Sequence, residues 1–179
     1  MQPELDNMSW PQVLELLRTG QVPARLIHKA IVRIAKPYNQ RAVEASKGEI
    51  SKFLEHPDAW VRHEALWFLA SWASLREFKP QVIHALQHDA DEDNRQFAAI
   101  CLGGLESGTG DPESLRILGA VVLDQAQPEH VRATAYAAMM LVHEGEQATP
   151  RSDYFYIGVG RVEEADLAWV LSVAGRASG

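Results

Sequence analysis

The chain of 179 residues is 46% hydrophobic and 23% charged, the composition of one compact globular domain with its own core. Its single cysteine excludes an internal disulfide, no apolar run reaches the roughly 20 residues of a membrane span, and the first ten residues lack a secretion signal, so we expect a cytoplasmic protein without membrane contact. The net charge of -7 argues against nucleic acid as a partner over most of the surface.

Helical spacing of apolar residues runs through nearly the whole chain. The first helix is expected over residues 9–20, where Ser9 and Gln12 form a capping box. The second spans residues 22–38 and ends at Pro37. Further helices are expected over residues 41–56, 56–72, 79–88, 91–107, 111–126, 128–145 and 162–175. The only plausible extended stretch, YFYIGVG at residues 154–160, is interpreted as a loop.

The second helix lies in the basic part of the chain. Residues 18–47 hold seven Lys or Arg against one acid, whereas residues 48–179 carry a net charge of -10. One helix face, opposite the apolar face, carries four cations: Arg25, Lys29, Arg33 and Lys36. This face has two interpretations, a solvated side of a capping helix or an electropositive patch for an acidic protein or for phosphates.

Three segments repeat one pattern when they are aligned on Arg62, Arg95 and Arg132, at intervals of 33 and 37 residues. Alanine stands three positions after each arginine, Leu or Met seven positions after it, and an acid three or four positions before it. Each unit follows another apolar helix and a short polar turn. One helix pair per interval is the repeating unit of an α-solenoid.

The stretches HPDAWVRHEALWFLA, DADEDNRQFAAICLGGL and QPEHVRATAYAAMMLV resemble the HEAT-repeat family. The resemblance implies an all-α fold, a short right-handed α-solenoid of about four antiparallel helix pairs with a terminal helix, in a single domain over residues 1–179. It is clearest over residues 42–144, which leaves residues 1–41 and 145–179 as degenerate or capping repeats. It also implies a ladder of turn acids and arginines, and close helix approach at the alanines. The second repeat departs from the family at Asn94, where Val is expected.

The helix over residues 56–72 has two distinct faces. Its apolar face, which predicts the core, carries Val61, Ala65, Phe68, Leu69 and Trp72. The resemblance implies that the other face lines a concave surface, together with equivalent positions of the next repeat. The expected partner-binding residues are Trp60, His63, Glu64, Trp67, Phe97 and Ile100. Two alternatives stay open, that both tryptophans pack on adjacent helices or that they stack on a small molecule or a base. Residues 150–161 could cover this groove.

No motif for catalysis, metal or cofactor emerges from the sequence. HEALW at residues 63–67 has Trp67 where a zinc helix needs a second histidine. His84 and His88 have the spacing of a ligand pair but are interpreted as surface residues. ESGTGDPES at residues 106–114 is interpreted as a turn and helix start, and Cys101 as a buried small residue.

The sequence therefore favours a non-catalytic module that binds another protein on the concave face, as a monomer or in a 1:1 heterocomplex, without cofactor or metal. An adaptor and a toxin-neutralising immunity protein are the candidate roles. Two alternatives follow from related helical repeats, a DNA-alkylation-repair glycosylase and a tetrapyrrole (bilin) lyase-type subunit. The acidic charge of residues 48–179 opposes the first, and no residue marks a pigment site for the second.

Overall fold

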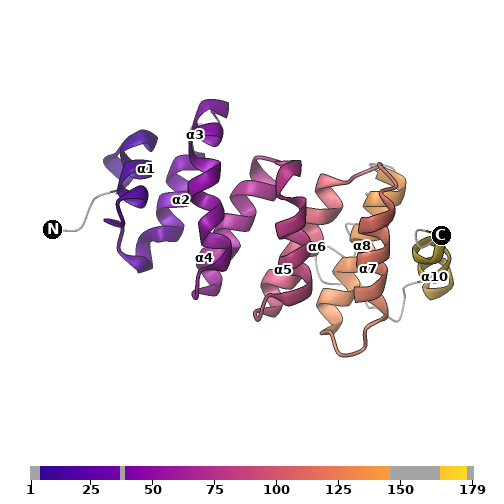
Figure 1. The fold of residues 1–179 in the computed structure, drawn as a ribbon. Helices are drawn as coiled ribbons and strands as arrows, with labels where there is room; N and C mark the ends of the chain where they lie inside the picture. The colour runs from indigo at the N-terminus through magenta and orange to yellow at the C-terminus, as the bar shows by residue number, and fades with distance from the viewer. Residues whose placement is uncertain (1–4, 37–38, 146–165, 177–179) are drawn as a thin grey trace. The chain divides into compact units, whose positions relative to one another are not determined.

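The computed structural model describes residues 5–36, 39–145 and 166–176 (Figure 1). Every regular element within these ranges is a helix, which confirms the all-α class. The chain divides into two compact units, Met1–Leu75 and Arg76–Gly179, here called the N-terminal and C-terminal units. Each unit is built from helices joined by short turns, as the repeat pattern predicts.

The N-terminal unit places α2 against both α1 and α4. Helix α1 begins with the predicted capping box, in which the Gln12 side chain accepts from the Ser9 amide at 2.9 Å. The core of the unit comes from the apolar stripes of α1 and α2, where Ile31 and Ile34 are fully buried. The elements are η1 (Leu5–Asn7), α1 (Trp10–Arg18), η2 (Ala24–Leu26), α2 (Ile27–Ala35), α3 (Gln40–Ile50), η3 (Ser51–Glu55), α4 (Ala59–Leu66) and η4 (Trp67–Trp72).

The C-terminal unit is centred on α8, which packs against both α6 and α7. Ten residues of α8 are buried, and most of them are small or flexible side chains such as Ala137 and Met139. These side chains let two neighbouring helices approach the same helix closely. The elements are η5 (Arg76–Phe78), α5 (Lys79–His88), α6 (Glu92–Leu105), α7 (Pro112–Leu123), α8 (Glu129–Glu144) and α10 (Leu167–Arg176).

The aligned alanines have the buried positions that the resemblance implies, whereas the aligned arginines contact main-chain carbonyls and the ladder of arginines and turn acids stays a prediction. The three aligned alanines, Ala65, Ala98 and Ala135, are fully buried. The three aligned arginines donate to main-chain carbonyls of the preceding segment. The acceptors are His56 for Arg62 (2.8 Å), Asp89 for Arg95 (2.8 Å) and Val122 for Arg132 (2.9 Å). Each arginine therefore fixes the turn or helix end that leads into its own helix.

Asn94, which stands where the repeat expects Val, is only 2% exposed. Its side-chain amide donates to Asp89 at 3.4 Å, and its main-chain amide donates to the Asp91 carboxylate at 3.0 Å. A buried polar side chain needs such a partner because water is excluded from it. The departure from the repeat pattern is thus compensated within the turn before α6.

Helix α4 continues into η4, a π-helix over Trp67–Trp72. The Ala73 amide donates to the Phe68 carbonyl, five residues earlier, at 3.0 Å. A π-helix has more residues per turn than an α-helix, so side chains after Trp67 rotate away from the faces expected for an α-helix. Trp72 is consequently half-buried. The expectation that its side chain belongs to the buried core is therefore wrong. Its ring packs beside Phe68 and Trp67, at centroid distances of 5.1 and 6.2 Å.

The terminal helix α10 docks on α7. Gly119 of α7 faces Ala174 so closely that a Cβ atom added to the glycine would lie 2.8 Å from the alanine Cβ. The Trp169 ring meets Tyr136 of α8 edge-on at 5.7 Å. Helix α10 begins at Leu167, within the predicted range of 162–175. Residues 150–161, including the predicted loop at 154–160, lie outside the described residues.

Candidate partner-binding surface

Trp60 stands in the first turn of α4, where Asp58 holds it. The Asp58 carboxylate accepts from the Trp60 amide at 2.9 Å and caps the helix. The indole lies parallel to the His63 ring, with centroids 5.5 Å apart and an interplanar angle of 6°. His28 of α2 meets the same indole edge-on at 6.3 Å. Even so, Trp60 is 55% exposed, so a large apolar surface faces solvent.

The three other predicted members on α4 and η4 are less accessible than Trp60. Glu64 is half-buried, and this burial raises the pKa of its carboxyl group. Trp67 is also half-buried, and its ring lies 6.2 Å from Trp72. This contact lies within η4 itself, so the interpretation that Trp67 packs on an adjacent helix stays a prediction, and the ring is still partly open. His63, which directly precedes Glu64 in the chain, is half-buried as well.

Two of the predicted residues, Phe97 and Ile100, lie on α6 in the C-terminal unit. Both are half-buried. On the same helix Gln96 donates to Thr134 of α8 at 2.9 Å, which joins two neighbouring repeats through a buried hydroxyl. Part of α6 next to Phe97 is thus occupied by a contact with α8.

The predicted electropositive residues lie on and beside α2. Arg25 in η2, Lys29 in α2 and Lys36 at the C-cap of α2 are exposed. Arg33 is half-buried, and its Nε atom has no hydrogen-bond acceptor among the described residues. His28, which sequence analysis did not select, connects this face to Trp60. The sequence places His28 between Arg25 and Lys29 on one helix face. It does not show that His28 contacts Trp60 on α4.

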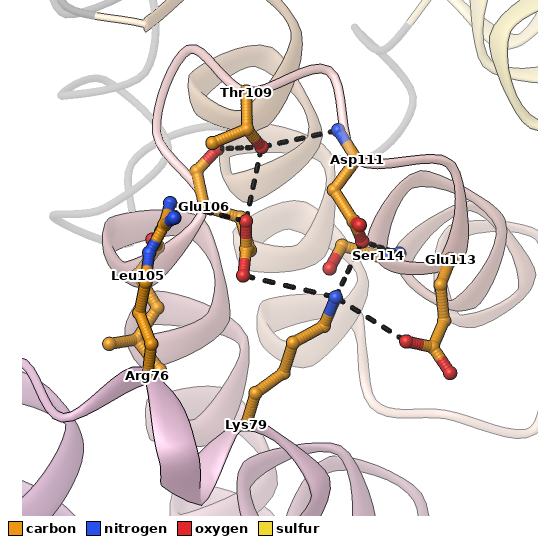
Figure 2. Close-up of polar contacts among 8 residues, drawn as sticks. All are labelled: Arg76, Lys79, Leu105, Glu106, Thr109, Asp111, Glu113 and Ser114. Carbon is orange, nitrogen blue, oxygen red and sulfur yellow. Dashed lines mark hydrogen bonds and ion pairs between the residues drawn. The ribbon is translucent and has the colours of Figure 1, made fainter.

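A second polar cluster, shown in Figure 2, joins α5 to the loop between α6 and α7. The Lys79 ammonium group, with a side chain 16% exposed, contacts three carboxylates. These are Asp111 at 2.7 Å, Glu113 at 3.3 Å and Glu106 at 3.8 Å. Arg76 adds a hydrogen bond to the Leu105 carbonyl at 2.8 Å and an ion pair with Glu106 at 3.3 Å. The cluster was missed because its members come from three separate segments.

The opposite charges in this cluster shift the pKa values of Lys79 and Asp111. Burial alone would lower the pKa of Lys79, but hydrogen bonds and charges of its carboxylate neighbours, Asp111 first, raise it. Burial alone would raise the pKa of Asp111, but Lys79 and the Ser114 amide lower it. Lys79 is thus a stably charged ammonium with no role as a nucleophile, and the cluster holds the loop in place.

The other chemical candidates of the sequence have structural explanations. Burial raises the pKa of Cys101 to about 12, so the thiol is not ionised at neutral pH. Gly108 and Gly110 donate their amides to the Leu141 and Val142 carbonyls near the end of α8, at 2.9 and 2.8 Å. These amides are therefore occupied and cannot hold a phosphate. Across the described residues, no three His, Cys, Asp or Glu side chains gather in a way that could hold a metal ion.

A cavity of about 380 Å³ opens in the N-terminal unit between the start of α3 and the end of η4. The π-helix turns Trp72 toward it. Its lining mixes amides, one carboxylate and apolar groups, from Asn39, Gln40, Val43, Glu44, Trp72, Ala73 and Leu75. This mixture selects no single class of ligand, so the surface around Trp60 is the stronger candidate.

Comparison with known proteins agrees with this repeat architecture. A family model described as HEAT repeats matches residues 49–140, slightly more than half of the chain. No curated protein and no solved structure matches the chain. Within the described residues, no helix is long and apolar enough to cross a membrane. The matched range contains all three aligned arginines, and the chain belongs to the HEAT-repeat family of helical-repeat proteins.

Proposed function

We infer that this protein is a non-catalytic module that binds another protein, with Trp60 as the anchor of the binding surface. The single observation that carries this proposal is the exposure of the Trp60 indole, 55%, in a ring cluster built from two helices. A tryptophan is costly to leave in water, and exposed aromatic anchors dominate the free energy of protein–protein association.

The family supports a binding role in general terms, because stacked helical repeats present extended surfaces to their partners. The surface around Trp60 adds the specific element. His63 and His28 hold the ring in one orientation, so the ring loses little conformational freedom when a partner covers it. An adaptor and a toxin-neutralising immunity protein both need such a preorganised surface, and the identity of the partner distinguishes these two roles.

Affinity capture from native lysate, followed by mass spectrometry, tests the proposal. Wild type is compared with Trp60→Ala and with the control Leu171→Ala, which removes a similarly exposed apolar side chain (58%) from α10. We expect a stoichiometric protein that is captured by wild type and by the control but not by Trp60→Ala. Capture of the same proteins by all three variants, or of none by wild type, contradicts the proposal.

A further inference from the structure

Two exposed cations of η2 and α2 flank, in the chain, a histidine that contacts the Trp60 indole. Helices α2 and α4 lie side by side (Figure 1) and are in contact. His28 provides the link, since its ring is 6.3 Å from Trp60. Lys29 follows His28 directly on α2, and Arg25 of η2 precedes His28 by three residues. The α2–α4 surface is defined here as Arg25, His28, Lys29, Trp60 and His63.

The stretch of chain that carries these cations contains no acidic residue to neutralise them. Residues 18–43 contain six Lys or Arg and no Asp or Glu. Within the described residues, no hydrogen bond or ion pair holds the head groups of Arg25 and Lys29, and both side chains are exposed. On α4, the Asp58 carboxylate is already engaged with the Trp60 amide, and Glu64 is half-buried. Among the described residues, Arg25 and Lys29 are thus unpaired cations, and His28, which lies between them in the chain, contacts the Trp60 ring.

We propose that the α2–α4 surface binds an acidic segment of a partner protein. Carboxylates of the segment contact Arg25 and Lys29, and one aromatic or aliphatic side chain covers the indole face that points away from His63. Complementary charge sets the orientation and speeds the encounter, while the ring supplies the apolar contact. This inference rests on the proposed function, because it specifies the partner of the same surface.

The distribution of charge favours a polypeptide over a nucleic acid as the occupant. Residues 1–75 hold nine Lys or Arg and eight Asp or Glu, whereas residues 76–179 hold eight and sixteen. A nucleic acid gains affinity from many phosphate contacts in a row, and the acidic C-terminal unit cannot supply them. A short acidic segment needs only the few groups of the α2–α4 surface.

Selection from a displayed library of random dodecapeptides on the full chain tests this inference directly. We expect enriched sequences to combine several Asp or Glu with at least one aromatic or aliphatic residue. The affinity of a selected peptide is then measured by fluorescence anisotropy. We expect Arg25→Glu/Lys29→Glu to weaken binding at least tenfold, and added salt to weaken it as well.

A matched control makes the same change in net charge elsewhere. Arg41→Glu/Arg116→Glu replaces two exposed cations of α3 and α7, and we expect its affinity to stay within threefold of wild type. Circular dichroism melts verify that each variant is folded. Equal losses in both double variants would mean that net charge alone matters, and this would overturn the inference.

The outcomes separate the two proposals. Enriched peptides that are neutral or basic and still require Trp60 overturn the acidic partner and leave the proposed function intact. Failure to enrich any peptide, tighter binding of a thymidine 30-mer, or self-association that competes with the peptide also overturns the acidic segment. Peptides that bind Trp60→Ala as well as wild type contradict the proposed function itself.

Discussion

The Trp60 indole lies flat on the His63 imidazole, one helical turn further along α4, with an interplanar angle of 6°. Residues three apart on a helix can meet in this way because they lie on the same face. The contact orients the ring and leaves much of it open to solvent. Trp60 is therefore both ordered and 55% exposed, which is unusual for the largest apolar side chain.

The two tryptophans of the candidate surface should differ in their effect on stability. Trp60→Ala removes an exposed ring, and we expect the free energy of unfolding to change by less than about 0.5 kcal/mol. Trp67→Ala removes a half-buried ring that packs beside Trp72, and a loss of about 1–3 kcal/mol is expected. Urea denaturation followed by circular dichroism measures both. A larger loss for Trp60→Ala than for Trp67→Ala would show that Trp60 is structural.

The pKa of Asp111 predicts a pH-dependent contribution to stability. Its folded-state pKa lies below its ordinary value of 3.8, so the stabilising charge is present above pH 3.8 and is lost as the pH falls through the lower folded value. Asp111→Asn keeps a cap for the Ser114 amide but removes the charge that faces Lys79. We expect the variant to be about 1 kcal/mol less stable near neutral pH.

Urea denaturation at a series of pH values tests this prediction. The difference between Asp111→Asn and wild type should shrink as the pH falls from 3.8 through the lower folded-state pKa, because the wild-type carboxylate is protonated first in the unfolded state and only then in the folded state. The same substitution at exposed Asp6 of η1, which has no hydrogen bond or ion pair among the described residues, serves as the control. A difference that is independent of pH would assign the effect of Asp111→Asn to capping geometry rather than to charge.

The repeat and most helix positions could be predicted from the sequence because they depend on local periodicity. Ala65, Ala98 and Ala135 mark the close approach of neighbouring helices in each of the three aligned repeats, and all three alanines are buried. The position of Trp72 could not be predicted in the same way. Its place follows from the π-helix of η4, and a period of 3.6 residues assumes an uninterrupted α-helix.

For the candidate surface, too, the sequence predicts which residues share a helix face but not which helices are neighbours. Helical periodicity placed Trp60 and His63 on one face, and the structure brings their rings together. Periodicity also placed four cations on one side of α2, but it could not identify α4 as the neighbour. The contact of His28 with Trp60, and the Lys79 cluster, depend on tertiary packing between elements distant in sequence.

Asn94 offers a test of the repeat consensus. Asn94→Val places the residue that the other two repeats carry, Val61 and Val131, at the buried position before the aligned arginine. The change removes a long hydrogen bond of 3.4 Å to Asp89 and adds apolar burial. Asp89 keeps the hydrogen bond from the Asp91 amide at 2.9 Å, so its carboxylate is not left without a partner when the Asn94 side chain is removed. We expect a stability gain of up to about 1 kcal/mol in thermal melts, and a clear loss would show that the amide is essential to the turn.

The contact between Gly119 and Ala174 predicts how α10 is attached to α7. Gly119→Ala adds a methyl group that would lie 2.8 Å from the Ala174 Cβ, well inside van der Waals contact, so one helix must move. We expect a loss of about 1–3 kcal/mol, because cores resist overpacking. The double variant Gly119→Ala/Ala174→Gly restores the total volume and should recover much of this loss. Destabilisation by Gly119→Ala that the second substitution does not relieve would mean that the glycine is needed for another reason than the approach of α10.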